Sequence, residues 1–187
     1  MQWLKITAIQ SKKFVCGFCG NHVASDAGIS TTDTIKGFRA FIYICPYCNY
    51  PSFIHGETQV PGVAPGNEVD HLPNDIATLY KEARDCVSVN AYTSAVLACR
   101  KLLMNIAVAQ GAKEGESFLT YVDYLAKAGY VPPNGRVWVD HIRNKGNEAN
   151  HEIKLMSKSD AEELISFVEM LLKFIYEFPS KVPSQKP

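Results

Sequence analysis

The chain has 187 residues, of which 47% are hydrophobic and 20% are charged. This average composition excludes a chain that is disordered throughout, and it also excludes collagen-like repeats. The 19 basic residues balance the 19 acidic ones, which excludes the strongly basic character of a chain that binds nucleic acid over most of its surface. No apolar run is long enough and sufficiently free of charge for a membrane span or an export signal, so we expect a cytoplasmic protein with no membrane partner.

The first part of the chain predicts short β-strands. The segment Phe38–Ile44 is rich in aromatic and β-branched residues, as strands are. Ser52–His55 can form the strand that returns from it, and Phe14–Val15 can form the end of an earlier strand. The polar stretch Asn21–Gly37 predicts a long loop.

Proline and glycine residues between Val60 and Asp75 favour a linker, because neither a helix nor a central strand continues through them. We therefore expect a first domain at residues 1–66 and a second at residues 67–179, followed by a flexible tail at 180–187. The first domain has five basic and three acidic residues, a net charge of +2, and residues 67–187 have a net charge of −2.

The second domain has the hydrophobic period of α-helices. Helices are expected at about 76–89, 92–110 and 117–128, and a fourth begins near Gly135. A fifth begins at a capping box, Ser159-Asp-Ala-Glu162, and ends before Pro179. Five amphipathic helices joined by short turns predict an all-α helical bundle.

The first domain contains two Cys-x-x-Cys pairs, Cys16–Cys19 and Cys45–Cys48. Each pair forms a tight turn that directs two sulfurs at one point, and four thiolates satisfy the tetrahedral preference of zinc. The pairs are 25 residues apart, longer than the usual spacing of about 15–20, and a longer loop explains this. The sequence therefore predicts a small β zinc ribbon with one structural Zn²⁺, because four cysteines leave no open position for catalysis.

Three alternatives concern the cysteines and nearby histidines. A redox Cys-x-x-Cys usually occurs once and beside a βαβ pattern, which is absent from this sequence. His22 and His55 are close enough in sequence to replace a cysteine ligand, but with four thiolates present we expect them on the surface. The remaining cysteines, Cys86 and Cys99, are expected to be buried thiols on the first two helices.

The ribbon also carries basic and aromatic residues that could contact a phosphate backbone and stack on bases. The alternative is that the lysines solubilise the domain and the aromatic rings cover its core. The residues are Lys5, Lys12, Lys13, Lys36 and Arg39, with Phe14, Phe18, Phe38 and Tyr47.

A polar stretch, residues 143–151, interrupts the apolar pattern of the helical domain. In one continuous helix Arg143, Asn147 and His151 would share a stripe, and Arg143 and His151 would be about 12 Å apart. If Gly146 ends the helix, the two side chains could approach each other. The sequence is compatible with both arrangements.

The region from about Asp75 to Pro179 resembles a bacterial helical domain family of unknown function that is grouped with the HEPN-like superfamily. The resemblance covers about 105 residues, and its most specific part is Gly-Asn-Glu-Ala-x-His. The segments that carry it are Tyr80-Lys-Glu-Ala83, Ala91-Tyr-Thr-Ser-Ala-Val96, Arg100 and Ile142-Arg-Asn-Lys-Gly-Asn-Glu-Ala-Asn-His151.

The resemblance implies a HEPN-like bundle that often forms homodimers and, where active, cleaves RNA without a metal. Arg143 would then stabilise the scissile phosphate and His151 would transfer protons. The binding residues would be Asn144, Asn147, Glu148 and Arg100. Seven residues separate Arg143 from His151, whereas the active signature usually has four to six.

Two functional hypotheses follow from the sequence. The first is a non-catalytic module that binds nucleic acid, a nucleotide or a protein partner and is linked to defence or nucleic-acid processes. The second is a metal-independent endoribonuclease that acts as a homodimer through Arg143 and His151. The zero net charge and the longer spacing between Arg143 and His151 favour the first.

Overall fold

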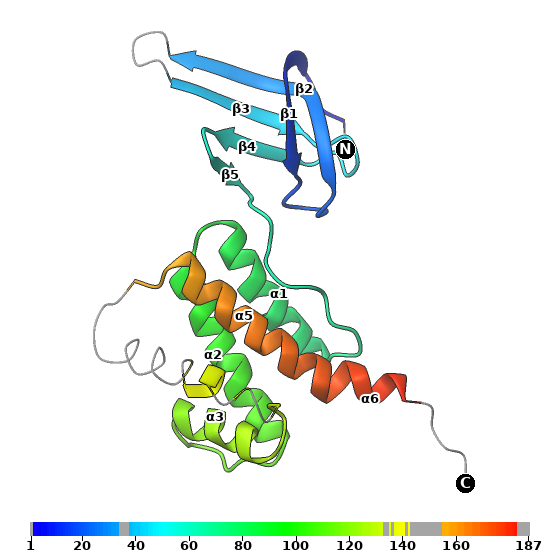
Figure 1. Ribbon diagram of the computed structural model, residues 1–187. Helices are drawn as coiled ribbons and strands as arrows, with labels where there is room; N and C mark the ends of the chain where they lie inside the picture. Colours follow the sequence, from blue (N-terminus) through cyan, green and yellow to red (C-terminus); the bar gives the residue numbers. More distant parts are fainter. Residues whose placement is uncertain are drawn as a thin grey trace. The chain divides into compact units, whose positions relative to one another are not determined.

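The computed structural model describes residues 2–33, 38–132, 135, 137–140, 142 and 155–182 (Figure 1). The chain divides into two units. The β-unit comprises Met1–Ala64 with Ser88–Asn90, and the helical unit comprises Pro65–Val87 and Ala91–Pro187. The expected fold class, a small β-domain followed by a helical domain, is confirmed.

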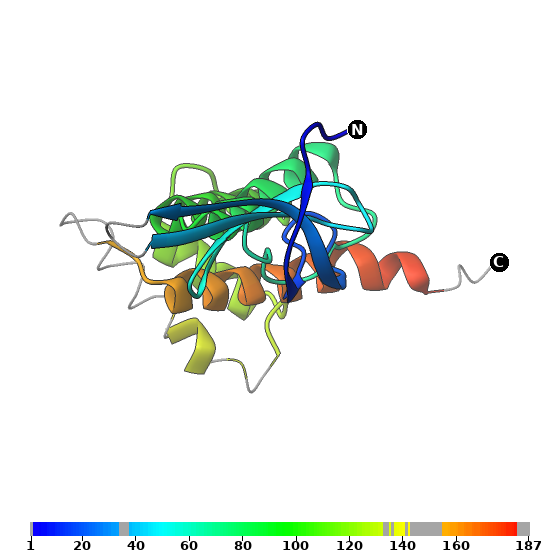
Figure 2. The same cartoon turned by 90° about the horizontal axis from the view of Figure 1, so that it is seen from above.

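The β-unit is a five-stranded antiparallel sheet in which each strand pairs with the next along the chain (Figures 1 and 2). Strands β3 and β4 coincide with the two strands predicted in that region, and β1 extends the predicted Phe14–Val15 towards the N-terminus. The strands are β1 (Thr7–Val15), β2 (His22–Asp33), β3 (Phe38–Ile44), β4 (Pro51–His55) and β5 (Thr58–Val60).

The expected loop at 21–37 was wrong, because β2 occupies most of it. β2 pairs on one side with β1 and on the other with β3, so its backbone groups form ladders along both edges. The pairing leaves no room for a side chain at Gly28, where a Cβ would lie 2.1 Å from the carbonyl oxygen of Ile42. The small and polar residues of this stretch fit a crowded central strand and do not indicate a loop.

The helical unit contains helices close to those expected (Figure 1). The core is made by their apolar faces, and Leu102, Leu103, Ile106, Leu125 and Val168 are fully buried in it. Residues 137–140 and 142, within the expected fourth helix, are also helical. The other helices are α1 (Asn74–Ser88), α2 (Tyr92–Ala109), α3 (Phe118–Lys127) and α5 (Lys158–Leu172), and α5 continues as a π-helical turn (Lys173–Glu177) and α6 (Phe178–Lys181).

Both ends predicted for the last helix were wrong. The capping box is formed by Ser157, whose side chain accepts from the Asp160 N–H while the Asp160 carboxylate accepts from the Ser157 N–H. At the other end, the helical path does not stop before Pro179 but continues through it to Lys181. The N–H of Phe178 bonds to the carbonyl of Lys173, five residues back, and this wider turn relieves the clash that a proline makes inside a regular helix.

The second half of the predicted linker, from Pro65, belongs to the helical unit and is hydrogen-bonded to its helices. Arg84 donates to the carbonyl oxygens of Pro65 and Gly66 at 2.8 and 2.9 Å. The backbone and side-chain N–H groups of Asn67 donate to the Glu169 carboxylate at 3.0 and 2.9 Å. Residues 61–73, all of which the structure describes, form no helix or strand, yet residues 65–67 are held on α1 and α5 by these hydrogen bonds.

Candidate metal centre and knuckle surface

Two turns of the β-unit repeat the same hydrogen bonds around a Cys-x-x-Cys pair. In the first, between β1 and β2, Cys16 donates its N–H to Asn21 and accepts from the Gly20 N–H, at 3.0 and 2.8 Å. In the second, between β3 and β4, Cys45 makes the equivalent bonds with Tyr50 and Asn49, both at 2.9 Å. We call these two turns the knuckles.

The residue after each cysteine pair has a positive φ. Gly20 has φ +69°, and Asn49, at the equivalent place, has φ +62°. Glycine adopts this left-handed conformation without steric cost, and asparagine is one of the few other residues that tolerates it. The left-handed residue reverses the chain so that the returning strand begins at once and both cysteine side chains stay on the same side.

The four cysteine sulfurs of the knuckles form one cluster. All four Sγ atoms lie within 4.8 Å of one another, and Cys16–Cys48 and Cys19–Cys45 are separated by 3.6 and 3.8 Å. A tetrahedron of thiolates around zinc has sulfur–sulfur edges of about 3.8 Å. The geometry and the donor set therefore fit one metal ion such as zinc. His22 and His55 are exposed and lie outside this cluster.

The four thiols have unequal environments. Burial acts to raise the pKa of Cys19, but hydrogen bonds from Asn21 outweigh it and lower the pKa to about 7. Burial and the neighbouring thiols raise the pKa of Cys48 to about 12. Because a metal ligates the thiolate form, binding of a cation is what allows all four sulfurs to carry charge at such close range.

The knuckles are anchored to the sheet by the packing of their first cysteines in its core. Cys16 and Cys45 are fully buried in the ribbon core beside Phe14, Tyr43 and Ile54. The Tyr43 ring lies 5.9 Å from that of Phe14, and its hydroxyl donates to the Gln10 carbonyl of β1 at 2.9 Å. These contacts tie β1 to β3, the two strands that lead into the knuckles.

Aromatic residues cover the outside of the knuckles. Phe18 and Tyr47 occupy the same place in the two pairs and are 51% and 75% exposed. The ring of Tyr50, which is 44% exposed, stacks on Phe18 with centroids 4.7 Å apart. Trp3 is half-buried and donates its indole N–H to the Asn49 carbonyl at 2.8 Å. We call Trp3, Phe18, Tyr47 and Tyr50 the knuckle surface.

Only part of the aromatic set expected to stack on bases is available. Phe18 and Tyr47 are exposed, but Phe14 is 9% exposed and belongs to the ribbon core, so for Phe14 the alternative reading is confirmed. Among the basic residues, Lys5, Lys13 and Arg39 are exposed and Lys12 is half-buried. Lys36 lies outside the described residues, as does the side chain of Phe38.

Sequence reasoning missed Trp3, Tyr50 and the role of Asn49. Trp3 reaches the second knuckle through its hydrogen bond to Asn49, 46 positions away in the chain. Tyr50 belongs to the second knuckle, but its ring stacks on Phe18 of the first, 32 positions away. The spacing of the cysteines reveals neither contact. Asn49 did have a signal, since an asparagine directly after Cys48 matches the glycine directly after Cys19.

The candidate residues of the helical unit are described only in part. Arg143, Asn144, Asn147, Glu148 and His151 lie outside the described residues, so their convergence stays a prediction.

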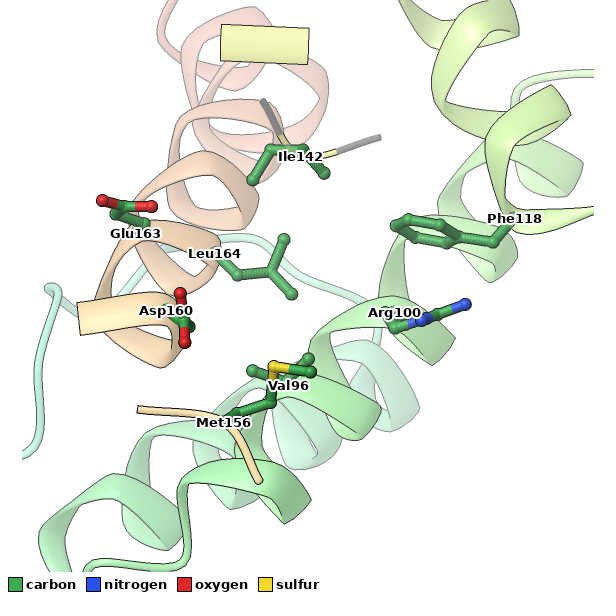
Figure 3. A pocket seen from close by; sticks show the side chains of 8 residues that line it. All are labelled: Val96, Arg100, Phe118, Ile142, Met156, Asp160, Glu163 and Leu164. Carbon is green, nitrogen blue, oxygen red and sulfur yellow. The ribbon is translucent and has the colours of Figure 1, made fainter. Parts of the chain in front are cut away.

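Arg100 is in the described part of α2. It is 8% exposed, and its guanidinium lies 4.4 Å from the centroid of the Phe118 ring. Burial lowers its pKa. Arg100 and Phe118 border a cavity of about 20 Å³ whose opposite side is α5 with Asp160 and Glu163 (Figure 3). This volume holds about one water, so the cavity as described is too small for a nucleotide.

The other two cysteines are free thiols of the helical unit. Cys99 on α2 is fully buried, as expected, and burial raises its pKa to about 12. Cys86 on α1 is only half-buried, so the expectation of a buried thiol was wrong for this residue, which lies at the rim of the core.

The fold and the cluster define a class of protein: a five-stranded antiparallel sheet with a four-cysteine cluster that could hold one metal ion, joined to a helical domain. Comparison with known families matches residues 81–186 to the family described as a domain of unknown function (DUF4145). The match covers more than half of the chain, and the protein belongs to this family. No curated protein and no solved structure matches the chain.

A membrane-spanning helix is absent from the described part of the chain, where each helix is too short or too polar for a bilayer.

Proposed function

We propose that this protein is a zinc-ribbon protein that binds single-stranded nucleic acid without cleaving it, and that the knuckle surface is the binding site. The observation that carries the proposal is the exposure of aromatic rings on both knuckles. Tyr47 is 75% exposed, and the Phe18–Tyr50 pair is stacked at 4.7 Å with about half of each side chain open. Exposed rings on a rigid turn are the arrangement on which unpaired bases stack.

The four cysteines would hold one Zn²⁺, which stabilises the knuckles by closing its shell with four thiolates. Each exposed ring lies between the two ligands of a pair or two residues after them, so its position depends on the ligated turn. The metal supplies folding energy to a sheet whose own core is small.

The charges near the knuckles agree with a polyanionic ligand. Lys5 is exposed close to Trp3, and Lys13 is exposed three residues before the first knuckle. The acidic residues of the β-unit, Asp26, Asp33 and Glu57, all lie seven or more residues from the nearest cysteine of the cluster. If bases stack on the knuckle surface, the phosphates that join them would lie near these lysines. The acidic residues of the β-unit are distant from the knuckles in the sequence.

The helical unit supports the same role. We propose that it is a HEPN-like bundle and that the protein is cytoplasmic. The bundle would pair with a second copy, so that two zinc ribbons could bind one nucleic-acid strand. The metal-independent ribonuclease remains the second candidate, because Arg143 and His151 lie within the matched family region.

The test is fluorescence anisotropy with labelled 12-nucleotide poly(U) RNA and poly(dT), beside a 12-base-pair duplex, at 50 and 200 mM salt. We expect both single strands to bind more tightly than the duplex and to weaken with salt. Tyr47→Ala should weaken binding about 5- to 150-fold, the range for loss of one stacked base. Phe53→Ala is the matched control, because Phe53 is 39% exposed on β4, outside the knuckles.

Removal of the metal with a chelator should abolish binding. The proposal fails if the single strands do not bind below 100 µM, or if Tyr47→Ala and Phe53→Ala bind alike. RNA cleavage that persists in chelator and is lost in His151→Ala would establish the ribonuclease instead.

A further inference from the structure

The helical unit has an open groove of about 930 Å³ that the proposed nucleic-acid site does not use. One side is α5 from Ser159 to Met170, and the other is formed by Pro132, Gly135, Val137 and Trp138. These residues all belong to the described part of the helical unit.

Helix α5 has two faces with different partners. Leu164, Ile165 and Val168 are buried in the core, where α5 packs on α2. On another face, Glu162, Ser166 and Met170 follow one another at intervals of four residues and line the groove. The helix therefore has a second, less buried stripe next to its core stripe.

The floor of the groove is apolar and partly fixed. Trp138 is half-buried, and its ring meets Phe167 of α5 edge-on with centroids 5.0 Å apart. Val137 is 80% exposed beside it, and Met170 is half-buried across the groove. A tryptophan held in place beside a flexible methionine is the kind of surface that accepts apolar side chains of a partner.

The wall of the groove is acidic. Glu162 and Glu163 are consecutive residues that line it. Lys158 reaches Glu162 at 3.6 Å, but both side chains are exposed, 63% and 44%, and such surface pairs are weak enough to exchange for another cation. Two carboxylates repel phosphate, so nucleic acid does not fit this groove.

We propose that the groove binds a basic, amphipathic segment of a protein partner. Leucine- or isoleucine-like side chains of the segment would lie on Val137, Trp138 and Met170. Its lysines or arginines would replace Lys158 at Glu162 and would pair with Glu163 in competition with the interaction that Glu163 already makes within the chain. The acidic sign of residues 67–187, net −2, would steer such a partner towards the helical unit and away from the basic β-unit. This inference concerns a different unit from the proposed function and stands independently of it.

The experiment uses the full-length protein with two synthetic 18-residue amphipathic helices, one of lysine and leucine and the other of glutamate and leucine. The chain contains two tryptophans, Trp3 and Trp138, so in a Trp3→Phe background the fluorescence reports on the groove. We expect the lysine peptide to bind and shift the Trp138 emission, and the glutamate peptide to leave it unchanged.

A double variant, Glu162→Gln with Glu163→Gln, should weaken binding of the lysine peptide roughly 2- to 30-fold, the effect of losing two surface ion pairs. The matched control is Glu82→Gln with Glu114→Gln, which removes the same charge from exposed positions outside the groove. The proposal is overturned if both double variants bind equally, if the glutamate peptide binds as well, or if no peptide binds below 1 mM. It is also overturned if sedimentation shows a dimer that Val137→Ser abolishes, because a second copy would then occupy the groove.

Discussion

The repeated geometry of the knuckles makes a prediction about Gly20 and Asn49. Both residues have a positive φ, +69° and +62°, but only one of them is glycine. Gly20→Ala adds a Cβ that meets nothing within 4 Å, so its effect is confined to backbone strain. The same strain arises in Asn49→Ala, whereas Asn49→Gly removes the strain that the native residue carries.

A left-handed conformation costs an ordinary L-residue about 1–2 kcal/mol. Since folding of a small metal ribbon and metal binding are coupled, that strain lowers the affinity for the metal by about 5- to 30-fold. We expect this loss in Gly20→Ala. A smaller loss is expected in Asn49→Ala, because asparagine already bears part of the cost, and Asn49→Gly should bind the metal at least as tightly as the native chain.

The assay is competition for Zn²⁺ against a colorimetric chelator, with thermal unfolding of the β-unit followed in parallel. The Trp3 indole bonds to the backbone carbonyl of residue 49, so none of the substitutions there removes this contact. If Asn49→Gly lowered the affinity for the metal as much as Asn49→Ala, the asparagine side chain and not the backbone conformation would set the affinity, and the reasoning would be refuted.

Two further predictions concern the helical unit. Ser157→Ala removes the N-cap of α5 and should lower the free energy of unfolding by about 1 kcal/mol. Ser159→Ala, which changes the N-cap predicted from the sequence, should change this free energy by less than about 0.5 kcal/mol. Urea unfolding followed by circular dichroism of the helices measures both, and equal effects would contradict the observed cap. Burial acts to raise the pKa of Glu169, but hydrogen bonds from Lys173 and Asn67 outweigh it and lower the pKa. Its contribution is therefore fully present above the ordinary carboxyl pKa of about 4.3 and is lost as the pH falls through the lowered value. Glu169→Gln should cost about 1–2 kcal/mol at pH 7 and flatten the loss of stability below pH 5; an unchanged acid profile in this variant would contradict the assignment.

The parts of the molecule that could be predicted from the sequence are those in which a local pattern causes the structure. Phe38–Ile44 forms a strand because most of its side chains favour one, and the cysteine pairs form the cluster because their spacing itself sets the geometry. β2 was missed because its fold depends on neighbours: Ser25 is 5% exposed and donates its hydroxyl to the Ile44 carbonyl at 2.7 Å. A buried serine that is satisfied by a neighbouring strand reads, in isolation, as a loop residue.

The aromatic pair Phe18–Tyr50 illustrates the same limit for the candidate site. The sequence places Phe18 in the first knuckle and Tyr50 in the second. Their contact depends on the two knuckles coming together at the cluster of four sulfurs, which the sequence of either knuckle alone does not indicate. The start of α5 was mispredicted for a different reason. Ser157 and Ser159 are both residue types that favour the N-cap position, and packing of the helix decides which of them is the N-cap.

The ligand set and the knuckle surface together constrain what the metal does. Four thiolates complete a tetrahedral shell, so a bound zinc would offer no open position to a substrate, and its effect passes through the shape of the knuckles. Phe18 and Tyr47 lie inside the cysteine pairs, so under the proposed function a bound metal would fix both rings before a base arrives and would reduce the ordering cost of association. Under the proposed function, metal and nucleic acid are therefore linked ligands of one small unit. The factor by which zinc strengthens nucleic-acid binding must equal the factor by which nucleic acid strengthens the retention of zinc.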